Sequence, residues 1–270
     1  MIPEKLEEYD YRENLIIDKN NPILVWKAWR DHFTNGKAHL SVPHSEDALT
    51  WNVFRSLQMA GNTGLEIISK VFGISKVNTI LFWGCDVENQ GDEQQLLNIL
   101  IRTIDGQLQG TMTEPDLVVI TECEVVFVEC KLNSSGKSSP WKASDKKDEK
   151  KIDGADKRFA IYKEMFPELM CINDWRNVYQ LIRQYVYARL LGCHLSKNPL
   201  VVSLVNKCHV DRLRPYYSIL KDCTAVDKNI FLDFVTWQDI SEEILKSNSL
   251  DYYKNRISAK INCALAHVRK

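Results

Sequence analysis

The chain has 270 residues, of which 44% are hydrophobic and 26% are charged, an ordinary composition for a soluble globular protein. The 35 Lys and Arg residues nearly balance the 36 Asp and Glu residues. This balance excludes a histone-like polycation but allows a local basic groove. No apolar run approaches the roughly 20 residues that span a bilayer. Because the acidic N-terminus also lacks the apolar segment of a secretory signal, we expect a cytoplasmic protein with no membrane partner.

The eight cysteines have no spacing that indicates a zinc site. No two of them form a C-x-x-C pair. Neighbours such as Cys193 and His194 point in different directions, so they cannot easily face one metal ion. We therefore expect reduced, mostly buried thiols.

Residues 1–44 are predicted to be an N-terminal extension that packs on the core. The main apolar cluster of this extension is Ile23–Trp29. Trp26 and Trp29 within it are expected to be core residues and not ligand-binding residues. The extension therefore carries no predicted chemistry.

Ser45 begins the first clear helix signal. It precedes Glu46 and Asp47, and apolar residues then recur at helical spacing. A serine N-cap followed by acids in the first turn is typical of a helix start, so a helix is predicted over 46–59. Further helices are predicted over about 64–72, 93–104, 156–166, 174–191 (ended by Gly192), 211–220 and, as a pair, 238–268.

Buried strands are indicated by short runs of Val, Ile, Leu and Phe. They are predicted over 79–85, 117–121, 125–131, 200–205 and 231–237. The residues Glu122-Cys123-Glu124 separate the second and third strands and suit a tight hairpin. Neither a repeat nor a linker interrupts the pattern, which predicts one compact α/β or α+β domain.

The stretch 133–151 is rich in Ser, Lys and Asp and is predicted to be a mobile, exposed loop. Lysines and acids alternate from Lys137 to Arg158. This run is either a flap that closes over DNA phosphates or a solvated loop of mixed sign. Trp141 within it would accordingly stack on a base or anchor the loop.

Two acids and a lysine are predicted to meet at one edge of the sheet. Side chains alternate along a strand, so Glu129 and Lys131 share a face while Cys130 points the other way. Asp116 begins the preceding strand, and the hairpin brings it beside Glu129. Burying charge without partners costs several kcal/mol or more, so packing alone does not explain this cluster.

Carboxylate oxygens, a backbone carbonyl and waters are the ligands that Mg²⁺ prefers. A lysine beside such an ion can orient the attacking water or help to deprotonate it, and can offset phosphate charge. The residue types therefore suit an in-line displacement at a phosphodiester.

Pro115-Asp116, followed thirteen residues later by Glu129-Cys130-Lys131, resembles the signature of the PD-(D/E)xK nuclease superfamily. This resemblance implies an α/β, restriction-endonuclease-like core made of a helix, a three-strand mixed sheet with a central hairpin, a second helix and a further strand. The resemblance covers residues 45–206. Residues 207–270 are then a C-terminal extension of the same domain, and both extensions are largely helical.

The resemblance implies roles for the clustered residues. Asp116 and Glu129 would ligate Mg²⁺, for which Mn²⁺ can substitute, and the carbonyl of Cys130 would be a further ligand. Lys131 would position or activate the water.

Two further features of the superfamily can be placed on the sequence. An acid on the first core helix often joins the metal site, and Glu46 is the matching position. A glutamine on the helix after the ExK strand matches Gln180 or Gln184, which would orient the nucleophile or the strand. The QxxxY spacing of some exonuclease branches is absent, because position 188 is Ala and position 184 is Gln.

The function implied is a metal-dependent nuclease that acts on DNA and leaves 5′-phosphate ends, in restriction, defence or repair. Many members of the fold act as dimers, so a homodimer is a further expectation. One alternative is a catalytically idle restriction-like domain that binds DNA or serves in assembly. The other is a metal-dependent hydrolase of a different substrate.

Overall fold

A computed structural model describes most of the chain, namely residues 11–35, 39–42, 45–88, 91–106, 114–132, 139–142, 149–221, 228–247 and 254–266. The chain forms two compact units. The terminal unit consists of Met1–Val77 and Thr236–Lys270, and the central unit consists of Asn78–Val235. This division does not coincide with boundaries after residues 44 and 206, so the extent of the nuclease core stays a prediction.

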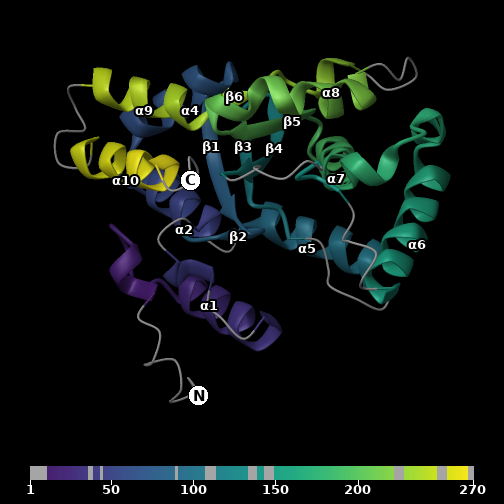
Figure 1. Ribbon diagram of the computed structural model, residues 1–270, viewed down its shortest axis with the longest axis horizontal. Helices are drawn as coiled ribbons and strands as arrows, with labels where there is room; N and C mark the ends of the chain where they lie inside the picture. The colour runs from purple at the N-terminus through teal and green to yellow at the C-terminus, as the bar shows by residue number, and fades with distance from the viewer. Residues whose placement is uncertain are drawn as a thin grey trace. The chain divides into compact units, whose positions relative to one another are not determined.

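A six-stranded mixed sheet runs through the central unit in the order β2-β1-β3-β4-β5-β6 (Figure 1). Strands β3 and β4 are antiparallel, whereas β4 and β5 are parallel. The strands are β1 (Val77–Phe82), β2 (Cys85–Asp86), β3 (Leu117–Thr121), β4 (Glu124–Lys131), β5 (Asn198–Val205) and β6 (Val235–Thr236). The predicted mixed α/β class is confirmed, but the sheet is larger than the predicted three-strand core.

A tight turn, not predicted from the sequence, enlarges the sheet at one edge. Leu81 pairs with Asp86 and Phe82 with Cys85, so only two residues connect β1 to β2. These residues, Trp83 and Gly84, have φ angles of 51° and 81°. Positive φ at both central positions is typical of a hairpin turn whose twist matches its strands. The predicted single strand 79–85 was therefore wrong at its end, since the chain reverses after Phe82.

Strand β3 lies at the centre of the fold, and all five of its residues are buried. Val118 and Ile120 belong to the main apolar cluster of the central unit, as do Val125 and Phe127 of β4. Helix α7 (Tyr179–Leu195) packs against both β4 and β5. The long connection from β4 through this helix to β5 is what a parallel strand pair requires.

The bounds of four helices of the central unit were predicted within a few residues, except for the start of α6 and the end of α7. They are α5 (Asp92–Asp105), α6 (Glu149–Met165), α7 (Tyr179–Leu195) and α8 (Val210–Lys221). Helix α6 begins inside the predicted 133–151 loop. Helix α7 continues past Gly192 and ends with Ser196 in the left-handed conformation at φ 55°. A Cβ at Gly192 would lie 2.8 Å from the carbonyl oxygen of Lys197, so this glycine permits a close approach inside the helix.

The predicted strand 231–237 is largely irregular. Phe231 forms only an isolated bridge with Val201, and β6 has two residues. Thr236 caps helix α9 (Trp237–Lys246) by a capping box with Asp239, so the chain enters a helix where the strand was expected to continue.

The predicted helix over 46–59 is confirmed in the terminal unit. It consists of α2 (Glu46–Thr50), the π-helical segment η4 (Trp51–Arg55) and α3 (Ser56–Met59). Ser45 is its N-cap, because the hydroxyl oxygen of Ser45 accepts a hydrogen bond from the backbone nitrogen of Ala48 at 3.1 Å.

The remaining helices are shorter or lie at the two ends of the chain. The α-helices are α1 (Pro22–Asn35), α4 (Asn62–Phe72), α9 (Trp237–Lys246) and α10 (Lys254–Ala266). The short 3-10 helices are η2 (Tyr11–Asn14), η3 (His39–Ser41), η5 (Pro167–Cys171), η6 (Trp175–Val178), η7 (Lys207–His209) and η8 (Lys228–Ile230). Within the described part of the chain, no helix is both long and apolar enough to cross a membrane.

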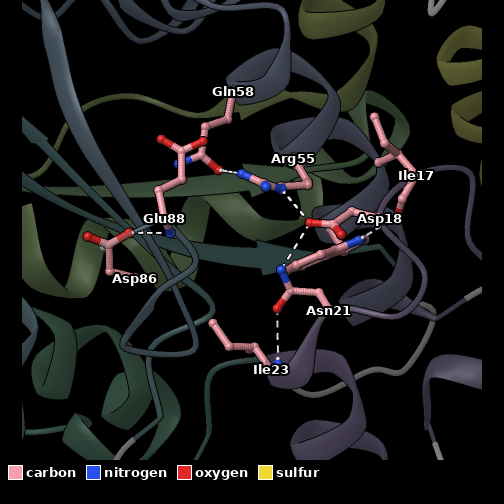
Figure 2. Close-up of polar contacts among 9 residues, drawn as sticks. Ile17, Asp18, Asn21, Ile23, Arg55, Gln58, Asp86 and Glu88 are labelled. Atoms are coloured by element: carbon pink, nitrogen blue, oxygen red, sulfur yellow. Dashed lines mark hydrogen bonds and ion pairs between the residues drawn. The ribbon is translucent and has the colours of Figure 1, made fainter. Parts of the chain in front are cut away.

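Buried polar side chains of η4 hold the N-terminal segment in the terminal unit. The amide of Asn52 accepts from the backbone nitrogen of Ile16 at 2.7 Å and donates to the carbonyl oxygen of Asn14 at 3.0 Å. Arg55 donates to Asp18 at 2.9 Å, as Figure 2 shows. Two of these contacts satisfy backbone groups that no regular ladder pairs, so the segment depends on side chains from η4.

Two expectations about exposure were wrong. Trp26 is 39% exposed and Trp29 is 41% exposed, because α1 turns Leu24 and Ala28 inward instead. These two inward residues are four apart and share one helix face. An apolar run alone did not reveal which of its members would face the core.

The thiols also differ from the expectation. Among the cysteines in the described residues, six are free and Cys171 is disulfide-bonded. Of the six, Cys130 alone is buried, whereas Cys123, Cys193 and Cys208 are among the exposed ones.

The contacts of Asn52 generate a stability prediction. Asn52→Leu leaves the Ile16 nitrogen and the Asn14 carbonyl without their partner, so it should lower the free energy of unfolding by about 2 kcal/mol. Urea unfolding followed by circular dichroism measures this. Ser45→Gly, which removes only a cap side chain, should cost a few tenths of a kcal/mol. Equal stability of the two variants would contradict the proposed role of Asn52.

Candidate active site

The clustered charges lie at the ends of β3 and β4 in the central unit. Glu129 of β4 is 3% exposed, and one of its carboxylate oxygens, Oε1, lies 2.9 Å from the Nζ of Lys131. Asp116 immediately precedes β3, and its Oδ2 accepts a hydrogen bond from the backbone nitrogen of Cys130 at 2.8 Å. The hairpin therefore brings Asp116, Glu129 and Lys131 together.

The strand register explains this meeting. Leu117 pairs with Val128 and Val118 with Phe127, so one further step along the antiparallel ladder sets Asp116 opposite Glu129. Paired residues point to the same face, which is the face that α7 covers. On the other side of β4, Ser203 of β5 pairs with Glu129.

Both candidate glutamines contact Glu129. The Nε2 of Gln184 donates to Oε2 of Glu129 at 2.5 Å. The amide of Gln180, oriented so that its nitrogen faces acceptors, donates to Oε1 of Glu129 at 2.9 Å and to the carbonyl oxygen of Pro140 at 3.2 Å. The two residues are four apart on α7 and share a face, so the helix presents two amides to one carboxylate.

Three nitrogen donors thus compensate the buried charge of Glu129. An ionised carboxylate removed from water without partners is costly, and charge-assisted hydrogen bonds are the stronger kind. Lys131 is itself largely buried, with 14% of its side chain exposed. The charge pair is therefore held mostly away from solvent.

Arg183 is a site neighbour that the sequence reading missed. It lies on α7 between the two glutamines. Burial lowers its pKa, but Tyr179, Tyr162 and Glu129 raise the pKa more, so the net shift is upward. Arg183 therefore keeps its charge near Glu129. Its spacing of three from Gln180 was the signal that could have revealed it.

A second buried acid lies beyond Arg183. Asp105 of α5 is fully buried, 3.3 Å from the Nε of Arg158, and its Oδ1 accepts from the hydroxyl of Tyr162 at 3.4 Å. Burial and then Asp105 raise the pKa of Tyr162, so this phenol stays protonated. Asp105 also raises the pKa of Arg183. Two buried carboxylates, those of Glu129 and Asp105, therefore raise the pKa of Arg183.

Trp141 anchors the segment that follows β4. It is fully buried and stacks on Phe234 with ring centroids 6.2 Å apart and planes at 18°. It also lies against Tyr217, with centroids 6.1 Å apart. Of the two roles predicted for Trp141, base stacking is incompatible with this burial. Of the predicted run from Lys137 to Arg158, residues 137–138 and 143–148 lie outside the described residues, and residues 149–158 belong to helix α6.

Glu46 lies in the terminal unit, in the first turn of α2. Its role at the metal site stays a prediction. Within the described ranges, no three His, Cys, Asp or Glu side chains gather as a metal site would require.

The donors at the β3–β4 end nevertheless fit a hard cation. Asp116 and Glu129 offer carboxylate oxygens, and Cys130 between the ExK residues offers a carbonyl. Mg²⁺ usually keeps several waters and is bound through one or two carboxylates. A two-carboxylate set is therefore chemically sufficient for Mg²⁺.

The comparisons with known proteins agree with this class of site. Residues 30–260 match the model of the family described as "Restriction Endonuclease associating with ARP" (REase-ARP). The chain belongs to this family. No curated protein and no solved structure matches the chain. The REase-ARP match supports a restriction-endonuclease-like protein, while the assignment of the PD-(D/E)xK motif rests on the residues described above.

The bond from Cys130 to Asp116 generates a prediction about folding. Asp116→Asn keeps an oxygen acceptor for this N–H, so its free energy of unfolding should stay within about 0.5 kcal/mol of the parent. Asp116→Ala removes the acceptor and should cost about 1 to 2 kcal/mol. Chemical denaturation of both variants is the measurement, and an equal loss in both would show that the bond has no structural role.

Proposed function

We propose that this protein is a Mg²⁺-dependent nuclease that hydrolyses phosphodiester bonds in DNA and leaves 5′-phosphate ends. The observation that carries the proposal is the buried pair of Glu129 and Lys131 with Asp116 beside it, at the end of two apolar strands. Membership of a restriction-endonuclease family supports the same class of activity. The restriction-endonuclease-like core, with its central hairpin, is part of this proposal.

Energetics favour a functional reading of this pair. Replacing a buried ion pair by apolar residues is often neutral or stabilising. A buried carboxylate with three nitrogen donors is thus an expensive way to join two strands whose residues are mainly apolar.

Each residue has a proposed part in the chemistry. Asp116, Glu129 and the carbonyl of Cys130 would hold the cation, and Glu46 would support it directly or through water. A bound Mg²⁺ would stabilise the negative charge that develops on the phosphate. Lys131 would orient the attacking water or assist its deprotonation, and its charge would offset that of the phosphate.

The partner proposed is DNA, and the biological setting proposed is restriction, defence or repair in the cytoplasm. A homodimer would allow each copy to cut one strand. The net charge near zero agrees with one local DNA-binding groove and an acidic remainder.

A catalytically idle domain is the second candidate, and one observation favours it. Lys131, Gln180 and Gln184 supply the described donors to Glu129. A carboxylate satisfied in this way could serve folding alone. The two candidates predict opposite results for metal-dependent cleavage.

Cleavage assays test the nuclease proposal. The full chain, incubated with supercoiled plasmid and with linear duplex, should nick or degrade DNA in Mg²⁺ or Mn²⁺. Chelation by EDTA should abolish cleavage, because the charge that the cation stabilises would then be uncompensated. The plasmid and linear substrates distinguish endonuclease from exonuclease action.

Two lysine substitutions distinguish chemistry at Lys131 from general DNA binding. Lys131→Ala should lower the cleavage rate by about 100-fold or more. Lys76→Ala, which removes an exposed lysine of the terminal unit, should leave the rate near that of the parent. Equal loss in both variants would point to general DNA binding and not to chemistry at Lys131. Cleavage that survives EDTA would overturn the metal-dependent mechanism.

A further inference from the structure

We propose that Gln180 is a positioning residue that links the carboxylate of Glu129 to the anchored segment Ser139–Lys142. The proposal rests on the nuclease function in one respect, that Glu129 is a ligand of the cation. It adds that cation affinity depends on residues that touch no cation, including Trp141.

Gln180 makes three bonds in two directions. Its backbone nitrogen donates to the carbonyl oxygen of Trp141 at 2.9 Å. Its side-chain amide donates to the carbonyl oxygen of Pro140 at 3.2 Å and to Oε1 of Glu129 at 2.9 Å. One residue at the start of α7 therefore holds both the segment after β4 and the carboxylate on β4.

Apolar contacts of Trp141 fix the segment Ser139–Lys142 in place. Trp141 is fully buried against Phe234 and Tyr217, and its backbone nitrogen donates to the hydroxyl of Ser139 at 3.2 Å. Among the described residues, none forms a hydrogen bond with the indole nitrogen of Trp141. The ring therefore acts by filling space, and a smaller aromatic ring should retain most of its effect.

The donors around Glu129 leave little freedom to its side chain. Oε1 receives both Lys131 and Gln180, and Oε2 receives Gln184. An ionised carboxylate has about four acceptor positions, of which the described donors occupy three. Removing the Gln180 contact would leave Lys131 as the one described donor to Oε1 and give the carboxylate more freedom to rotate. Loss of such an outer partner typically weakens metal binding by about 10- to 100-fold.

Gln184 offers an internal comparison. It contacts the same carboxylate from the same helix, and no bond joins it to Ser139–Lys142 among the contacts described. Trp141 should therefore act through Gln180 and not through Gln184. Residues that act through a shared partner have non-additive effects, whereas independent ones add.

Calorimetric titration of the full chain with Mn²⁺ tests the link. Gln180→Met should weaken binding by about 10- to 100-fold. Trp141→Phe should bind within about twofold of the parent, and Trp141→Ala should be weakened toward the level of Gln180→Met. The double variant with Trp141→Ala and Gln180→Met should be no weaker than Gln180→Met, whereas Trp141→Ala combined with Gln184→Met should show the product of the two single effects.

Controls separate this inference from the proposed function. Gln95→Met changes an exposed glutamine of α5 and should bind Mn²⁺ as the parent does. If Asp116→Asn and Glu129→Gln lose binding while Gln180→Met does not, the link is wrong and the metal site stands. If Asp116→Asn and Glu129→Gln bind as the parent does, the metal site itself fails. Gln180→Met decides the matter even if Trp141→Ala does not fold, because Gln180 is only partly buried.

Discussion

The candidate site depends on holding one carboxylate, almost completely buried, among nitrogen donors. Glu129 achieves this through donors from β4 and α7, the strand that carries it and the helix that covers it. Supplying those donors constrains the fold, because α7 must cross the sheet with two amides facing β4. That crossing follows from the parallel pairing of β4 and β5, which needs a long connection between the two strands. The parallel pairing of β4 and β5 and the burial of Glu129 therefore depend on the same connection through α7.

A second group of charged residues lies on the helices of the central unit, and these charges also need partners. Arg183, Arg158 and Asp105 come from three helices and lie in the same part of the core as several tyrosines. Removing one member of such a set leaves an uncompensated buried charge, which costs far more than an exposed pair contributes. The charges on α5, α6 and α7 thus specify how these helices pack, in addition to the apolar contacts that drive their packing.

Local patterns in the sequence predicted the centre of the fold well. Period-two alternation placed Glu129 and Lys131 on one face, and the hairpin-length gap brought Asp116 to them. Spacing of four on one helix brought both glutamines to Glu129, although the sequence left open which of them would reach it. These features depend on the nearest neighbours in strand or helix, so a short window of sequence contains enough information.

The features that sequence did not predict depend on distant contacts. In the sequence Gly192 indicates a helix end. In the structure it lies inside the helix, where the carbonyl oxygen of Lys197 comes too close for a side chain. Trp141 lies in a polar, lysine-rich stretch, and only its partners Phe234 and Tyr217, more than 70 residues later, make it a core residue. The same reason applies to Trp26 and Trp29, whose apolar neighbours gave no indication of which face α1 would bury. At this site the distant contact matters most, because Trp141 and Gln180 together connect a polar stretch to the carboxylate on which the proposed chemistry depends.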